Sequence, residues 1–196
     1  MVDPLDPSAH VPENSDAVFA VQADLLDDAE CERIIEVALA RFGQVDLLVN
    51  AAASFHRETI IGSDRLGDHF DRDFHLNVRV PLILSAQLAR HDWLAKRTEN
   101  MAMNRNIVNV ASIGGVRLYP GGGVSVYSAS KAALAQLSRH MADEFWPFGV
   151  RVNVLAPSAF PRLIATERVS ERLRELDEGL DNGRVVVLSK DGDSVE

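Results

Sequence analysis

The stretch Asn106-Ile107-Val108-Asn109-Val110-Ala111 decides the fold. Its length and its β-branched residues are typical of a strand that is buried on both faces. The next regular segment, Tyr127–Phe145, is a long predicted helix whose apolar residues recur at helical spacing: Leu134, Leu137, Met141 and Phe145. A buried strand followed by a long amphipathic helix is the unit from which parallel α/β sheets are built.

The same unit recurs in both directions along the chain. Further strands are predicted over residues 17–23, 45–50, 149–155 and 185–188, and further helices over about 28–42, 70–88 and 166–176. Pro81 lies inside the second of these helices and predicts a kink, because it removes one backbone hydrogen bond. The alternation predicts an α/β fold with a mostly parallel sheet flanked by helices. Residues 17–196 form one predicted domain, and the proline-containing residues 1–16 are expected to be an extended or disordered lead-in.

The composition is that of a globular enzyme. The 196 residues are 46% hydrophobic and 25% charged, and the net charge of −9 argues against a nucleic-acid partner. No apolar run approaches the roughly 20 residues of a membrane span, and the N-terminal stretch lacks the apolar core of a signal peptide. We therefore expect a cytoplasmic protein with a small-molecule substrate and no membrane partner.

Tyr127 and Lys131 are the first candidates for chemistry. They are four residues apart, so on a helix their side chains lie on one face. A phenol has a pKa of about 10, and a neighbouring ammonium favours the phenolate and lowers that pKa. Ser112 follows a strand end, where open α/β sheets collect their ligands, and could hold a substrate oxygen against the phenol. A Tyr-x-x-x-Lys spacing alone is common on helices, so its context decides its meaning.

That context resembles the short-chain dehydrogenase/reductase family. The matching stretches keep the family's order over roughly residues 17–160, and they are Asp24-Leu25, Leu48–Ala53, His75–Val78, Ile107–Ser112, Tyr127–Lys131 and Arg151–Pro157. The resemblance implies a Rossmann-like fold that is incomplete, because the first family strands and the glycine-rich turn are missing. It also implies an oxidoreductase that uses NAD(P) and no metal.

The resemblance also implies roles for single residues. Tyr127 would be the acid/base, Lys131 would lower its pKa and contact the nicotinamide ribose, and Ser112 would orient the substrate oxygen. Asn77 would support a proton-relay water. The remaining implied cofactor contacts are Asp24 at the adenine, Asn50 along the cofactor edge, and Pro157.

The sequence departs from the family pattern where the cofactor is held. No glycine occurs before Gly43, so no glycine-rich turn can precede the strand predicted at 17–23. The family's Asn-Asn-Ala-Gly reads Asn50-Ala51-Ala52-Ala53, and its Pro-Gly reads Pro157-Ser158. Because a glycine-rich turn lets backbone N–H groups approach a pyrophosphate, these departures weaken the predicted NAD(P) site.

The missing first strand also has a structural consequence. It would leave a gap between the strands predicted at 17–23 and 45–50, exposing two ladders of backbone polar groups. Either the 17–23 strand shifts inward, or another chain fills the place. The helix that begins at Tyr127 commonly forms the family's dimer face, so the resemblance implies a homodimer or homotetramer.

Three functions remain open. The first is an NAD(P)-dependent carbonyl reductase or alcohol dehydrogenase. The second is a cofactor-independent enzyme of the same scaffold that uses Ser112 and Tyr127 for elimination, cyclisation or a dehalogenase-like lyase reaction. The third is a non-catalytic scaffold or partner subunit.

Three other features have plainer interpretations. The acidic and histidine residues of one helix are spread around it, which predicts a solvated face and no metal site: Asp68, His69, Asp71, Asp73 and His75. His56, in the preceding loop, is expected to be merely exposed. Gly121-Gly122-Gly123 predicts a flexible substrate loop, because no strand leads directly into it.

Overall fold

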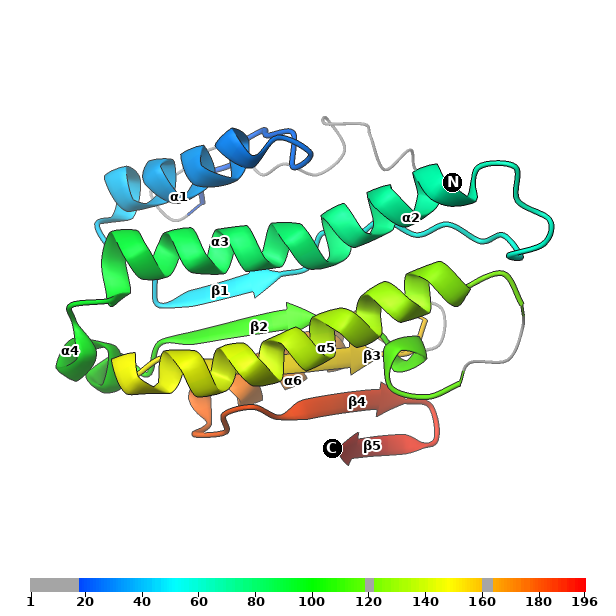
Figure 1. Ribbon diagram of the computed structural model, residues 1–196. Coiled ribbons are helices and arrows are strands. Elements are labelled where there is room, and N and C mark those ends of the chain that lie inside the picture. The colour runs from blue at the N-terminus through cyan, green and yellow to red at the C-terminus, as the bar shows by residue number, and fades with distance from the viewer. Residues whose placement is uncertain (1–17, 119–121, 160–163) are drawn as a thin grey trace.

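The computed structural model describes residues 18–118, 122–159 and 164–196 (Figure 1). Within these residues one sheet has the strand order β1-β2-β3-β4-β5. The first four strands are parallel and β5 is antiparallel to β4. The strands are β1 (Leu47–Asn50), β2 (Asn106–Val110), β3 (Arg151–Pro157), β4 (Val185–Ser189) and β5 (Gly192–Val195). The predicted, mostly parallel α/β sheet is confirmed.

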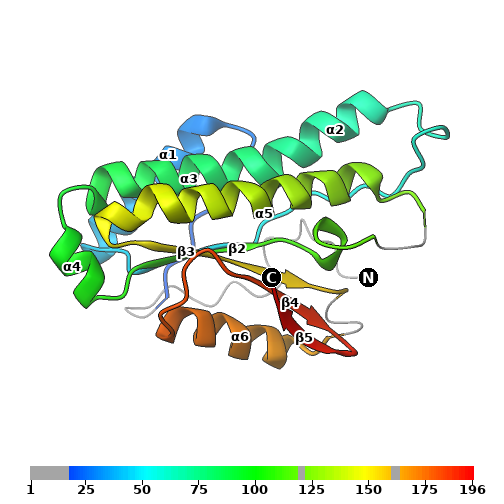
Figure 2. The ribbon, with the colours of Figure 1, turned by 60° about the horizontal axis from the view of Figure 1, so that its bottom comes forward.

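Helices cover both faces of this sheet. Figure 2 shows α1, α3 and α5 on one face and α6 on the other. The helices are α1 (Asp28–Phe42), α2 (Leu66–Phe74), α3 (Val80–Leu88), α4 (Arg97–Ala102), α5 (Ser125–Phe145) and α6 (Thr166–Glu178). Short 3₁₀ turns follow β2 at Ile113–Gly115 and α5 at Trp146–Phe148.

The central strands are buried because their alternate side chains enter two separate cores. Ile107 of β2 packs in the core beneath α1, α3 and α5. Its neighbour Val108 points the other way, into the core beneath α6 with Leu155 and Leu176. Each fully buried aliphatic side chain of this kind contributes about 1.5–3 kcal/mol. The sheet is thus held rigidly from both sides, which fixes the ends of its strands.

Helix α1 begins and ends where its sequence predicts. The Asp27 carboxylate accepts a hydrogen bond from the Ala29 N–H at 2.9 Å and caps the first turn. Gly43 ends the helix with a φ of 80°, and its N–H donates to the Leu39 carbonyl oxygen.

The distortion predicted at Pro81 takes the form of a widened helical turn. Residues His75–Arg79 are π-helical, directly between α2 and α3, and Pro81 lies at the start of α3. Figure 1 shows α2 and α3 following one another as a single long rod. The wider turn makes room for the proline ring without ending the helix, and π-helical stretches of this kind are frequent at functional sites.

The strand predicted at residues 17–23 is wrong for the part the structure describes. Residues 18–23 carry no strand, and Val18 and Phe19 are 41% and 39% exposed. The Gln22 carbonyl accepts from the Arg33 guanidinium, so this segment is tied to α1. Within the described residues β1 pairs only with β2, so the predicted inward shift of the 17–23 strand to a place beside β1 is not seen there. That another chain fills this place stays a prediction. The lead-in predicted over residues 1–16 lies outside the described residues.

Candidate active site

Lys131 lies at the carboxyl ends of the central strands. Its Nζ donates a hydrogen bond to the carbonyl oxygen of Val110, the last residue of β2, at 2.8 Å. The side chain is almost fully buried. The loop after β2 lies directly on α5 here, since a Cβ on Gly115 would come within 2.6 Å of the Lys131 carbonyl carbon. The helix face that carries Lys131 is therefore fixed against the edge of the sheet where parallel strands collect ligands.

Burial changes the acid–base properties of Lys131. Desolvation lowers the pKa of the Lys131 ammonium from 10.5 to about 8, and the negative charge of Asp73 opposes this. Near neutral pH the group is therefore charged but close to its titration range. It is poised to lose and regain a proton.

Tyr127 lies one helical turn before Lys131, and its pKa is raised. Burial is the main cause, and the charge of Asp73 adds to it, while a hydrogen bond with Ser112 lowers the pKa. The direction differs from the expectation that Lys131 brings this pKa down. Lys131 Nζ is 5.9 Å from the centroid of the Tyr127 ring and is engaged by Val110, so the desolvation of the phenol prevails. With its pKa raised above 10, the phenol is protonated near neutral pH.

Asn77 lies in the π-helical turn and ties the site together. Its amide accepts from the Ser54 N–H at 2.9 Å and donates to the Ser54 carbonyl at 2.9 Å and to Ser130 Oγ at 2.8 Å. Ser130 Oγ in turn donates to the Tyr127 carbonyl oxygen at 2.7 Å. Asn77 thus joins the loop after β1 to the first turns of α5. Its implied part in a proton relay stays a prediction.

Two of the implied cofactor contacts lie at the carboxyl ends of strands. Asn50 is buried at the end of β1, where its Nδ2 donates to Asn109 Oδ1 at 2.8 Å. Its Oδ1 has no hydrogen-bond partner among the described residues, and the same is true of Ser158 Oγ, next to Pro157 at the end of β3. Two buried acceptors left unpaired at this edge are what a polar ligand would satisfy.

Asp24 is placed differently. It is exposed, and its Oδ1 accepts from the Leu26 N–H at 3.0 Å in the turn before α1. Its recorded contacts are local to that turn, so the structure does not join it to the set around Tyr127.

The solvated face predicted for α2 is wrong at Asp73. Its side chain is fully buried, and its Oδ1 lies 2.8 Å from His56 Nδ1. His56, expected to be merely exposed, is thus bonded to a buried carboxylate, while Asp68 and Asp71 are exposed as predicted. The pair was missed because its members come from a loop and a helix seventeen residues apart. A signal was present in the helical spacing: Asp73 precedes Asn77 by four residues, which places both on one face.

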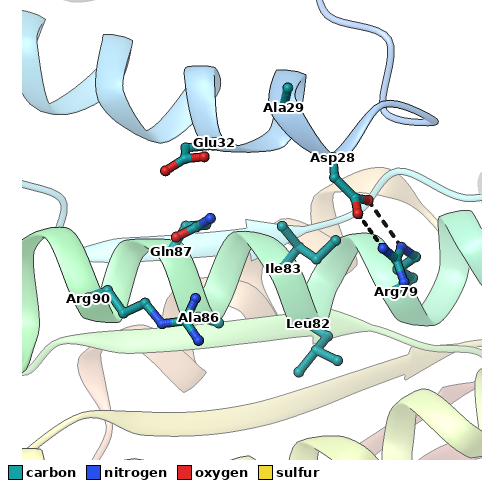
Figure 3. A pocket seen from close by; sticks show the side chains of 9 residues that line it. All are labelled: Asp28, Ala29, Glu32, Arg79, Leu82, Ile83, Ala86, Gln87 and Arg90. Carbon is teal, nitrogen blue, oxygen red and sulfur yellow. Dashed lines mark hydrogen bonds and ion pairs between the residues drawn. The ribbon is translucent and has the colours of Figure 1, made fainter.

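A groove between α1 and α3 lies apart from these residues. It has a volume of about 550 Å³ and includes Asp28, Glu32, Arg79 and Arg90 in its lining (Figure 3). An ion pair between Arg79 and Asp28 crosses one end of it. None of the implied catalytic residues lines it, so we do not assign the chemistry to this groove.

The described part of the chain contains neither a cluster of metal ligands nor a membrane-spanning helix. There, no group of three or more His, Cys, Asp or Glu side chains is arranged to hold a metal ion. Over the same residues, no helix combines the length and apolar character needed to cross a bilayer.

Comparisons with known proteins agree with the fold and the motifs. Residues 4–173 match the family model described as short chain dehydrogenase. The 7alpha-hydroxysteroid dehydrogenase of Bacteroides fragilis is 30% identical over 148 residues, which are 74% of this chain and 53% of that protein. Levodione reductase of Leifsonia aquatica is 29% identical over 82% of this chain and 55% of its own length. The chain thus spans about half the length of these curated relatives.

A solved structure gives the same result. A short chain dehydrogenase from Mycobacterium avium superposes with a TM-score of 0.79 at 27% identity, covering 91% of this chain and 62% of that one. The sequence motifs, the parallel sheet and the family match agree with one another: the chain belongs to the short-chain dehydrogenase family.

Proposed function

We propose that the protein is an oxidoreductase that acts on a carbonyl or alcohol group of a small molecule, with Tyr127 as the acid/base. The observation that carries this is the set at the strand ends: the half-buried Tyr127, whose pKa responds to Ser112, and the buried Lys131, held by the Val110 carbonyl. A protonated phenol beside a second hydroxyl suits a substrate oxygen that gains or loses a proton.

In the reducing direction the protein's own groups handle the oxygen. The Ser112 hydroxyl holds the carbonyl oxygen, and Tyr127 donates its proton to that oxygen as negative charge develops there. The Ser112 hydrogen bond favours the phenolate that this step leaves behind. Lys131, buried and with a pKa of about 8, is the adjacent group from which the phenolate can regain a proton.

A nicotinamide dinucleotide is the cofactor we propose, and it would supply or accept the hydride. Lys131, Asn50 and Pro157 would hold its nicotinamide end, and the unpaired Asn50 Oδ1 and Ser158 Oγ fit a polar ligand there. Among the described residues no glycine-rich turn precedes α1 to cradle the pyrophosphate, so the fit is to the nicotinamide end alone. The solved 4-hydroxyisoleucine dehydrogenase, 25% identical with a TM-score of 0.71, is complexed with NADH, which supports this choice.

Nicotinamide fluorescence during titration with NADH and NADPH tests the proposal. We expect saturable enhancement with at least one of them at a concentration in the range of enzyme KM values, about 1 μM to 1 mM. Lysozyme titrated in parallel controls for non-specific enhancement. No binding of either cofactor at millimolar concentration would contradict a nicotinamide-dependent activity.

A second candidate is a cofactor-independent acid–base enzyme, such as a lyase. The Ser112 hydroxyl, which lowers the pKa of Tyr127, favours it, because these two hydroxyl groups can move a proton without a hydride source. The same titration separates the two candidates: this enzyme would bind neither cofactor, yet would lose its activity when Tyr127 is replaced by Phe.

We also propose that the protein forms a homodimer or homotetramer through the face that carries α5. Light scattering on the purified protein tests this, and a monomer at high concentration would contradict it.

The particular substrate is best sought among small ketones, aldehydes and alcohols.

A further inference from the structure

Asp73 is a buried carboxylate that the proposed chemistry does not use. It lies at the end of α2 with its side chain fully buried. One oxygen, Oδ1, is paired with His56 Nδ1 at 2.8 Å, and the other, Oδ2, has no hydrogen-bond partner among the described residues. Burying a carboxylate costs desolvation free energy unless the group is paired. The single hydrogen-bond partner of Asp73 offsets only part of that cost.

His56 connects this carboxylate to the surface. Its side chain is 29% exposed, and its Nδ1 also lies 3.4 Å from Ser54 Oγ. Its ring stacks on that of His69 at 4.1 Å with an interplanar angle of 9°. His69 Nδ1 in turn lies 3.4 Å from the Glu58 carboxylate. The buried end of this chain of groups is Asp73, and its other end, Glu58, is exposed.

The loop that carries His56 lies directly on the candidate active site. Phe55 packs edge-on against the Tyr127 ring with 4.7 Å between the centroids. Ser54 is bonded through its N–H and its carbonyl to the Asn77 side chain. His56 directly follows Phe55. A change at His56 therefore acts on the residue next to the one that contacts Tyr127.

Asp73 also acts on the site through its charge. Its electrostatic interaction raises the pKa of Tyr127 and opposes the lowering of the pKa of Lys131. Other titratable groups near the pair include His69 on the same helix, which lies 3.4 Å from Glu58 of the loop, and His75, two residues after Asp73, whose buried Nε2 has no hydrogen-bond partner among the described residues. Asp73 is thus a fixed negative charge that both proposed proton carriers of α5 experience.

We propose that the buried Asp73 carboxylate, held in place by His56, sets the protonation of the Tyr127–Lys131 site, both acting as positioning residues. The Asp73 carboxylate holds the protons on Tyr127 and Lys131. His56, whose Nδ1 lies 2.8 Å from Asp73 Oδ1, holds that carboxylate in place beside the site. The consequence for turnover rests on the proposed function, whereas the electrostatic coupling itself does not.

The titration of Lys131 measures this coupling without a substrate or cofactor. The chain has only Lys96 and Lys190 besides Lys131, so protein labelled with ¹³C at lysine Cε gives few signals, which Lys96→Arg and Lys190→Arg assign. Asp73→Asn keeps the size of the side chain and removes its charge, and it should lower the Lys131 midpoint by about one pH unit. Asp71→Asn, an equal charge change at an exposed position of α2, should leave the midpoint in place.

His56→Gln provides the second arm and serves alone if Asp73→Asn does not fold. Because His56 holds the Asp73 carboxylate in place, its removal should weaken the coupling and lower the Lys131 midpoint by less than Asp73→Asn does, and this effect should vanish in the double variant. A merely structural pair would leave the midpoint in place or shift it equally with and without Asp73, and either result overturns the proposal. Failure of the nicotinamide titration would leave this result untouched, so the two proposals fail independently.

Discussion

Lys131 Nζ donates to the Val110 carbonyl oxygen across 2.8 Å, which joins the helix that carries Tyr127 to the last residue of a central strand. On burial the Lys131 ammonium loses its surrounding water and keeps one hydrogen-bond acceptor, the Val110 carbonyl oxygen. The lowered pKa of about 8 is the consequence of that loss. Several properties of the protein should depend on it.

The stability of the protein should rise between pH 8 and 9.5 because of Lys131. The folded state releases this proton at about pH 8 and the unfolded state at 10.5, so the unfolded state binds more protons in between and stability grows with pH. Lys131→Met, which cannot titrate, should lack this rise. Urea unfolding at pH 7 and pH 9.5 should show the wild type gaining about 2 kcal/mol relative to the variant. Parallel changes in the two proteins would contradict the buried ammonium.

Ser112→Ala should raise the pKa of Tyr127 further, because the hydrogen bond that favours the phenolate is removed. The chain has only one other tyrosine, so phenolate absorbance in a Tyr119→Phe background reports on Tyr127 alone. Ser128→Ala is the control. It is the same kind of substitution, placed on α5 next to Tyr127, and it should leave the titration of Tyr127 unaltered. An unchanged titration in Ser112→Ala would show that the two hydroxyls do not interact.

Gly115→Ala should destabilise the protein by about 1–3 kcal/mol, and Gly114→Ala by less. A Cβ at Gly115 would meet the backbone of α5, at 2.6 Å from the Lys131 carbonyl carbon, and backbone atoms cannot turn aside. A Cβ at Gly114 would meet Ser128 Oγ at 2.9 Å, the end of a side chain that can rotate away. Thermal unfolding of the two variants checks the order. Equal losses would mean that the loop after β2 does not lie on α5 as closely as described.

Asn77→Ala should loosen the loop after β1 and cost about 2–4 kcal/mol, because it leaves the buried N–H and carbonyl of Ser54 without their partner. Hydrogen exchange of residues 51–58 is the measurement, with the exchange of β2 as the internal reference. If the amides of this loop were as well protected from exchange in the variant as in the wild type, a contact other than Asn77 would be what orders the loop.

Much of this architecture was predictable because the cues are local. The apolar run at residues 106–111 predicts a strand, and the sequence over about 28–42 predicts a helix; both elements agree with the structure. The four-residue spacing of Tyr127 and Lys131 needed only a helix to bring them to one face.

What the sequence did not predict depends on neighbours distant along the chain. The run at 17–23 has strand composition, but a strand also needs a partner, and residues 18–23 are tied to α1 through Gln22. Strand β5 is short and polar, and it forms only because it pairs with β4. The burial of Asp73 depends on His56 from another segment. The composition of a segment does not show which distant residues it will contact in the fold.

The most direct test of the proposed chemistry is the turnover of Tyr127→Phe. The oxidation of NADH and NADPH should be followed with small ketones and aldehydes, for the wild type and the variant side by side. Loss of the phenol's proton should lower kcat/KM by about 10²–10⁴-fold while nicotinamide affinity is retained. A Tyr127→Phe protein that reduces its carbonyl substrate at the wild-type rate would contradict the assignment of Tyr127 as the acid/base.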